Sequence, residues 1–91
     1  MSKKFIRNQT FLAEDLGDGV LLLNTEDNQV IELNRTGAHL WRRLQEPATR
    51  IELIGELKGL YPEEDAIKLE ADADDFLLQA TVCKTIREIE G

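Results

Sequence analysis

The stretch QVIELNRTGAHLW, residues 29–41, passes from a strand to a helix with almost no loop between them. Residues 29–33 have the length and composition of a short β-strand, in which successive side chains point to opposite faces. Asn34 suits the N-cap of a helix, because its side-chain oxygen can accept a hydrogen bond from an otherwise unpaired backbone N–H. The apolar residues that follow recur every three or four positions, which predicts an amphipathic helix over 35–45.

Two further strands are predicted on the N-terminal side of this junction. VLLLN, residues 20–24, is a continuous apolar run, and the four polar residues after it lead into 29–33, which predicts an antiparallel hairpin. TFLAEDLG, residues 10–17, precedes an Asp-Gly turn signal and is a candidate first strand. Residues 1–9 are basic and polar, and we expect them to form a loose or lightly docked lead-in.

Two more helices are predicted on the C-terminal side. Thr49 and Glu52 form a capping-box pattern at the start of a helix over 50–60. The stretch 64–80 is the longest helical pattern, and the tail 81–91 fits either a last strand or a continued helix. The chain is therefore expected to be one domain, residues 1–91, of the α+β class, with a three-stranded antiparallel sheet followed by three helices.

The composition opposes binding to nucleic acid or to a membrane. The chain has 18 acidic and 11 basic residues and a net charge of −7, whereas phosphate binding requires a surplus of lysine and arginine on at least one face. No run reaches the roughly 18 apolar residues of a membrane span, and the N-terminus lacks the apolar centre of a signal peptide. We therefore expect a cytoplasmic protein.

The sequence contains no recognisable catalytic or metal-binding set. Its one cysteine, Cys83, and its one histidine, His39, are far apart and cannot supply a structural zinc site. The glycines form no phosphate-binding loop, so we expect neither an enzyme nor a cofactor. Trp41 is the expected central aromatic residue of the core. Gly37 lowers the helix propensity by about 1 kcal/mol against alanine, which predicts a packing reason: without a side chain there, another backbone can come close.

The third helix is predicted to have two apolar faces. The core stripe consists of Ala66, Leu69, Ala73, Phe76, Leu77 and Ala80, and the residues expected to face water opposite it are Lys68, Asp72, Asp75 and Gln79. A second apolar flank, with acidic residues beside it, consists of Ile67, Glu70, Ala71, Asp74 and Leu78. This flank could pack on the C-terminal tail or belong to a broad buried arc. It could instead form the wall of a groove for a peptide that has apolar anchors and basic neighbours.

The strand 29–33 supplies the other half of this candidate site. If it lies at the edge of the sheet, an extended peptide could add to it as another strand. Ile31 and Leu33 are the better candidates for the core, so that Glu32 would be free to hold a basic side chain; an ordinary solvated edge is the alternative. The strand residues of the candidate site are Gln29, Val30, Ile31, Glu32 and Leu33.

The segment VLLLNTEDNQVIELNRTGAHLWRRL, residues 20–44, resembles the PqqD-like proteins, also called RiPP recognition elements or peptide chaperones. The family pattern of a strand ending in Leu-Asn and a helix starting with small residues is matched by Val30, Leu33, Asn34, Thr36, Gly37, Ala38, Leu40 and Trp41. ATRIELIGELKGLYP resembles the second helix of the family, and ADADDFLLQA resembles the third. The likeness covers about residues 11–80. The chain departs from the family in its tail, TVCKTIREIEG, and in QEPAT, where an Asp-Gly turn is usual.

The resemblance implies a winged helix-turn-helix domain that binds peptide rather than DNA. Such proteins capture the leader segment of a ribosomally made precursor peptide, which adds beside strand 29–33 against helix 64–80, and deliver it to a leader peptidase or another modifying enzyme. A lasso peptide pathway is favoured over pyrroloquinoline quinone biosynthesis, where the partner would be a radical SAM enzyme. A winged-helix DNA-binding regulator is an alternative of another class, which the acidic residues of helix 64–80 oppose.

Overall fold

The computed structural model of the chain describes residues 3–90, and the elements in that range begin and end with strands. In chain order they are β1 (Lys3–Arg7), β2 (Phe11–Asp15), β3 (Val20–Asn24), β4 (Val30–Leu33), α1 (Arg35–Arg43), α2 (Arg50–Leu60), α3 (Ala66–Val82) and β5 (Ile86–Glu90). None of the helices in this range has both the length and the hydropathy that a membrane span requires.

Strands β2, β3 and β4 form an antiparallel sheet in that order, with β3 in the centre. The predicted hairpin is confirmed, since Leu22 of β3 lies opposite Ile31 of β4 and Val20 lies opposite Leu33. β4 has no strand on its other side within the described residues, so it is an edge strand. The predicted α+β class, with three antiparallel strands and three helices in a winged-helix arrangement, is confirmed.

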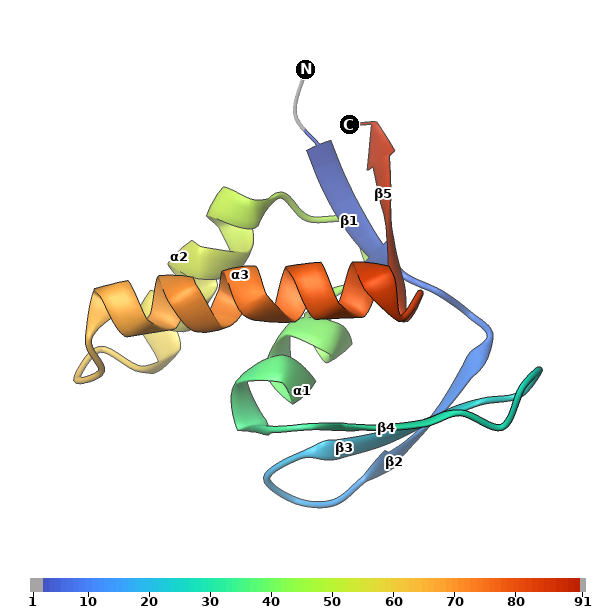
Figure 1. Cartoon of the computed structure of the whole chain (residues 1–91). Coiled ribbons are helices and arrows are strands. Elements are labelled where there is room, and N and C mark those ends of the chain that lie inside the picture. Colours follow the sequence, from blue (N-terminus) through green and yellow to red (C-terminus); the bar gives the residue numbers. More distant parts are fainter. Residues whose placement is uncertain (1–2, 91) are drawn as a thin grey trace.

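The N-terminal segment and the tail form a second sheet that the sequence did not reveal. β1 pairs antiparallel with β5, so that the two strands lie side by side although they come from opposite ends of the sequence (Figure 1). The expectation of a loose lead-in over 1–9 is wrong for residues 3–7, because Phe5 is only 8% exposed and belongs to the core. Residues 1 and 2 lie outside the described range. The tail forms a strand from Ile86, which decides between the two alternatives.

Local capping residues set where the three helices begin. The side chain of Asn34 accepts a 2.8 Å hydrogen bond from the backbone N–H of Gly37, which confirms the predicted N-cap of α1. Thr49 and Glu52 form the predicted capping box of α2, with bonds of 2.8 and 3.1 Å. Asp65 caps α3, so that this helix starts two residues later than expected and continues to Val82.

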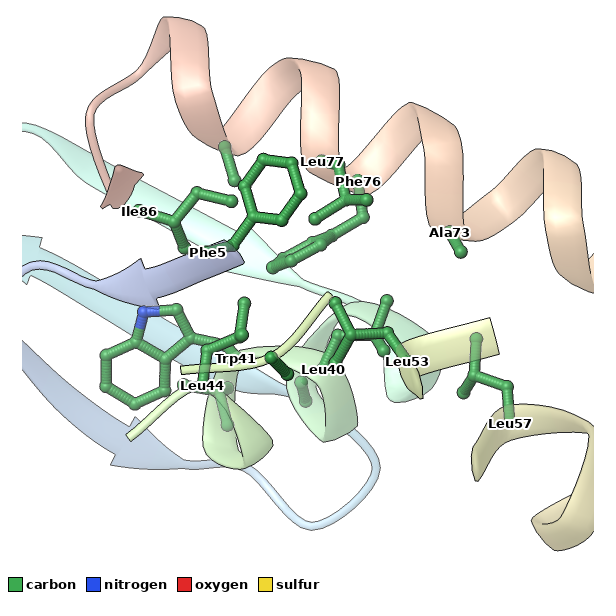
Figure 2. Packing of buried hydrophobic residues seen from close by; sticks show 14 of the residues in the cluster. Phe5, Leu40, Trp41, Leu44, Leu53, Leu57, Ala73, Phe76, Leu77 and Ile86 are labelled. Atoms are coloured by element: carbon green, nitrogen blue, oxygen red, sulfur yellow. The ribbon is translucent and has the colours of Figure 1, made fainter. Parts of the chain in front are cut away.

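The hydrophobic core lies between the helices and both sheets, and α1 runs through its centre (Figures 1 and 2). Trp41 is 5% exposed and Leu40 is fully buried, which confirms Trp41 as a core residue. Phe5 and Ile86 of the small sheet pack near Phe76 and Leu77 of α3 (Figure 2). The core stripe predicted for α3 is confirmed for Leu69, Ala73, Phe76, Leu77 and Ala80, whereas Ala66, the first residue of the helix, is exposed.

Candidate functional site

The free edge of β4 presents unpaired backbone groups. The N–H of Asn24 donates to the carbonyl of Gln29 over 2.8 Å. Because bonded pairs alternate along an antiparallel ladder, Ile31 and Leu33 bond to β3, whereas the N–H and C=O groups of Val30 and Glu32 point away from it. Within residues 3–90 no other segment of backbone bonds to that side of β4. An extended chain could therefore hydrogen-bond to this edge.

The side chains of β4 divide between the core and the solvent as the sequence predicts. Ile31 and Leu33 are partly buried and pack against the core, which confirms that they form the inner face of the strand. Val30, on the other face, is 59% exposed, and Glu32 is also exposed. A peptide strand added here would consequently have one face toward the core side of the sheet and one toward water.

A groove of about 290 Å³ runs between β4 and α3. Its walls are formed by Ile31, Glu32, Leu33, Asn34, Thr36, Gly37, Asp72, Asp75, Phe76, Gln79 and Cys83. A smaller apolar hollow of about 50 Å³ adjoins it, sharing Ile31, Leu33, Phe76, Gln79 and Cys83 and adding Ala80 and Thr85. The groove is therefore acidic over Asp72 and Asp75 and apolar toward the end of α3.

Gly37 allows α1, β4 and α3 to meet at the floor of this groove. A Cβ atom at this position would lie 3.3 Å from Cδ1 of Phe76 and 3.3 Å from the capping oxygen of Asn34. Both distances are tighter than ordinary van der Waals contact, so a side chain here would displace one of the two neighbours. Gly37 thus has a packing reason, but the atoms that come close belong to side chains and not, as predicted, to another backbone. Phe76 consequently sits against the start of α1 while it also lines the groove.

The structure brings only the strand half of the predicted site to the groove. Ile31, Glu32 and Leu33 line it, Val30 contributes the open edge, and Gln29 precedes the strand. The five residues predicted on the third helix are absent from its walls; they are Ile67, Glu70, Ala71, Asp74 and Leu78. Whether any of the ten residues binds a peptide stays a prediction.

Two of these five residues bind α2 instead of forming an acidic rim. Arg50 donates to both carboxylate oxygens of Asp74, with Nε–Oδ1 and Nη2–Oδ2 distances of 2.6 and 2.9 Å. Lys58 donates to Glu70 over 3.1 Å. The hydrogen bond from Arg50 lowers the pKa of Asp74 against a smaller opposing effect of desolvation, and the same bond raises the pKa of Arg50. Both pairs therefore join α2 to α3 on the side away from β4.

The apolar members of the predicted flank lie in solvent. Ile67 is 78% exposed and Leu78 is 62% exposed, so the alternative in which this flank packs on the C-terminal tail is wrong, as is the broad buried arc. Helical periodicity separates the faces of α3 correctly, but it does not determine which polar face lies next to β4.

Four groove residues on α3 and its C-cap were not assigned to a site from the sequence. Asp72, Asp75 and Gln79 were expected to face water, and Cys83 was considered as a zinc ligand and rejected. Their positions i, i+3, i+7 and i+11 form one stripe on a helix, and this spacing is the signal in the sequence that could have grouped them. Among the described residues no three histidine, cysteine or carboxylate side chains gather closely enough to hold a metal ion.

Comparison with known proteins identifies the family. The family model of coenzyme PQQ synthesis protein D (PqqD) matches residues 19–85, and a search of curated proteins finds no match. A solved structure described as TbiB1 in complex with the TbiA(beta) leader peptide is 20% identical, with a TM-score of 0.77 over 94% of this chain and 99% of that chain. Another, described as lasso peptide synthetase B1 complexed with the leader peptide, is 18% identical, with a TM-score of 0.73 over 90% and 95%. These likenesses show a shared fold, and because the family model spans most of its length, the chain belongs to the PqqD family.

Proposed function

We propose that this protein binds the leader segment of a ribosomally synthesised precursor peptide, without catalysis, by adding it as a strand to β4. The observation that carries the proposal is the open edge of β4 beside a groove whose other wall is α3. Main-chain hydrogen bonds to Val30 and Glu32 would provide affinity, and the groove would select side chains.

The dimensions of the groove suit an extended peptide better than a small-molecule substrate. A volume of about 290 Å³ that is open along a strand edge accommodates a few side chains of a passing chain. The apolar hollow formed by Ile31, Leu33, Phe76, Ala80 and Cys83 would accept one apolar anchor. Each main-chain bond would contribute about 0.5–1.5 kcal/mol, so the affinity depends on several of them together with the anchor.

A lasso peptide pathway is the favoured context. The two solved structures of similar fold are both described as complexes with a leader peptide, and one is described as a lasso peptide synthetase B1. We infer that the protein presents the bound leader to a leader peptidase or another modifying enzyme, in the cytoplasm. The PqqD description of the family favours a second pathway, in which the precursor is that of pyrroloquinoline quinone and the partner is a radical SAM enzyme.

The DNA-binding alternative conflicts with the charge of α3. In a winged helix the recognition helix approaches phosphates, and here it exposes Asp75 and Asp74 with Lys68 as its one basic residue. Tight, salt-dependent binding to duplex DNA would contradict the peptide-binding proposal.

An NMR titration tests the proposal directly. The ¹⁵N-labelled protein is titrated with the leader segment of the precursor peptide encoded beside its gene. We expect the largest amide shifts over 30–33 and over 72–83. Shifts confined to α2 or β1 would contradict binding in the groove. Shifts concentrated at Ile67, Ala71 and Leu78 would show that the peptide binds the second apolar flank of α3 instead.

A further inference from the structure

The carboxylates of α3 fall into two groups with different surroundings. Glu70 and Asp74 form ion pairs with Lys58 and Arg50 of α2. Asp72 and Asp75, which line the groove, form no ion pair with any described residue. Arg50 and Lys58 thus neutralise the carboxylates on one side of α3, whereas those on the groove side keep their negative charge.

The groove offers Asp72 and Asp75 no basic partner. Its walls include neither lysine nor arginine, and Glu32, although it belongs to the wall, has its side chain on the outer face of β4 together with Val30. Two basic residues, Arg35 and Lys68, line an adjoining hollow beside Asp72. Arg35 is engaged there, since its guanidinium lies 4.6 Å from the centre of the Tyr61 ring. The carboxylates of Asp72 and Asp75 therefore border the groove, and a peptide bound there would partly exclude water from them.

The acidic and apolar parts of the groove lie at a defined spacing. β4 and α3 cross the molecule alongside each other with opposite chain directions (Figure 1). The apolar hollow is centred near residues 79–80 of α3 and the carboxylates near 73–74, a separation of about 9 Å at a rise of about 1.5 Å per residue. In an extended peptide, residues i and i+2 lie on the same face about 7 Å apart. The length of a lysine or arginine side chain covers the rest of the distance to the carboxylates.

We infer that the peptide recognised by this groove carries a lysine or arginine two positions from an apolar anchor residue. The anchor enters the hollow beside Phe76 and Cys83, and the cation lies between Asp72 and Asp75. This inference rests on the proposed function, because it specifies which leader sequences the same site accepts. The open edge and the groove make the site, and the carboxylates of Asp72 and Asp75 determine the charge of its occupant.

Selection from a random peptide library tests the inference without knowledge of the natural precursor. Twelve-residue random peptides displayed on phage are selected against the full chain in about 50 mM NaCl, where exposed charge pairs are little screened. The selection is repeated with the double variant Asp72→Asn/Asp75→Asn. The matched control is Asp18→Asn/Glu63→Gln, which changes the net charge equally at two exposed residues outside the described hollows.

We expect the wild type and the control to enrich peptides with a basic residue two positions from an apolar one. The groove variant should enrich the apolar residue alone. For the best peptide, replacing its lysine or arginine by glutamine should weaken binding about three- to tenfold in the wild type and less than twofold in the groove variant. Equal loss in both proteins would overturn the inference.

The outcomes separate this inference from the proposed function. Enriched peptides that lack a basic residue, but whose binding is lost in Val30→Pro, would refute the charge rule and leave strand addition standing. If no peptide is enriched and the leader segment causes no amide shifts in the NMR titration, both the function and the inference fail.

Discussion

Gly37 of α1 and Phe76 of α3 are so close that a Cβ atom on the glycine would lie 3.3 Å from Cδ1 of the ring. Gly55 of α2 offers a contrast, because a Cβ atom there would meet nothing within 4 Å. Gly55→Ala should raise the free energy of unfolding by about 1 kcal/mol through helix propensity alone. Gly37→Ala should gain clearly less, since the methyl group must displace Phe76 or the oxygen of Asn34. Urea unfolding of the two variants checks this, and equal gains would contradict it.

The two edges of the three-stranded sheet provide a matched test of strand addition. Val30 has its N–H on the open side of β4, and Ala13 has its N–H on the open side of β2, because the bond from Leu16 N–H to the Gly19 carbonyl sets the alternation there. Val30→Pro should weaken leader binding about three- to tenfold by removing one main-chain bond. Ala13→Pro should leave binding unchanged. Isothermal titration calorimetry on both folded variants decides, and unchanged affinity of Val30→Pro would argue against strand addition.

Cys83 reports on the occupancy of the groove, because it is the one cysteine of the chain and lines both parts of the groove. Its alkylation by a maleimide should abolish leader binding by filling the apolar hollow. Conversely, leader peptide should slow the alkylation in proportion to the fraction of protein that it occupies. Mass spectrometry measures the rate, and Cys83→Ser treated with the same reagent controls for reaction elsewhere. If saturating leader peptide leaves the alkylation rate of Cys83 unchanged, the peptide binds outside this hollow.

Phe5 tests whether β1 is an integral part of the fold. Because its side chain is 8% exposed within the core, Phe5→Ala should lower the free energy of unfolding by about 3–5 kcal/mol. Ile67→Ala, at a side chain that is mostly in solvent, should change it by no more than about 0.5 kcal/mol. Chemical denaturation followed by Trp41 fluorescence compares them. A loss below about 1 kcal/mol for Phe5→Ala would mean that the N-terminal strand is only lightly docked.

The ion pair between Arg50 and Asp74 should make stability depend on pH in acid. Arg50 lowers the pKa of Asp74 in the folded state, so the ionised carboxylate contributes stability above the ordinary aspartate value of about 3.9 and loses it as the pH falls through the folded pKa. Asp74→Asn should therefore be less stable than the wild type near neutral pH, and the difference should shrink toward about pH 2. Urea midpoints across this range measure it. A stability difference between Asp74→Asn and the wild type that is the same at neutral pH and at about pH 2 would contradict this role of the ion pair.

The elements that the sequence predicted well are those specified by neighbouring residues. Asn34 and the pair Thr49 and Glu52 cap helices through bonds to backbone groups three positions away, so their residue types alone indicate where the helices start. The hairpin of β3 and β4 is local in the same sense. The side-chain division between Ile31 and its neighbour Glu32 follows from strand geometry once the hairpin is accepted.

The features that the sequence did not predict depend on partners far away in the chain. β1 finds its partner in β5, more than seventy residues later, and no local pattern around Phe5 indicates this pairing. The structure places other residues of α3 on the groove wall than the stripe predicted from the sequence, because Arg50 and Lys58, which bind Asp74 and Glu70, belong to a separate helix. Only the packing of α2 against α3 determines which stripe remains for β4.

The pairing of β1 with β5 places Lys3 opposite Glu90, so the described chain enters and leaves the domain at one point. β4, with its free edge, belongs to the other sheet (Figure 1). A domain built in this way can be inserted into a surface loop of a larger protein, or joined to one at either strand, with little strain on its own fold. Such a fusion would leave the open edge of β4 accessible.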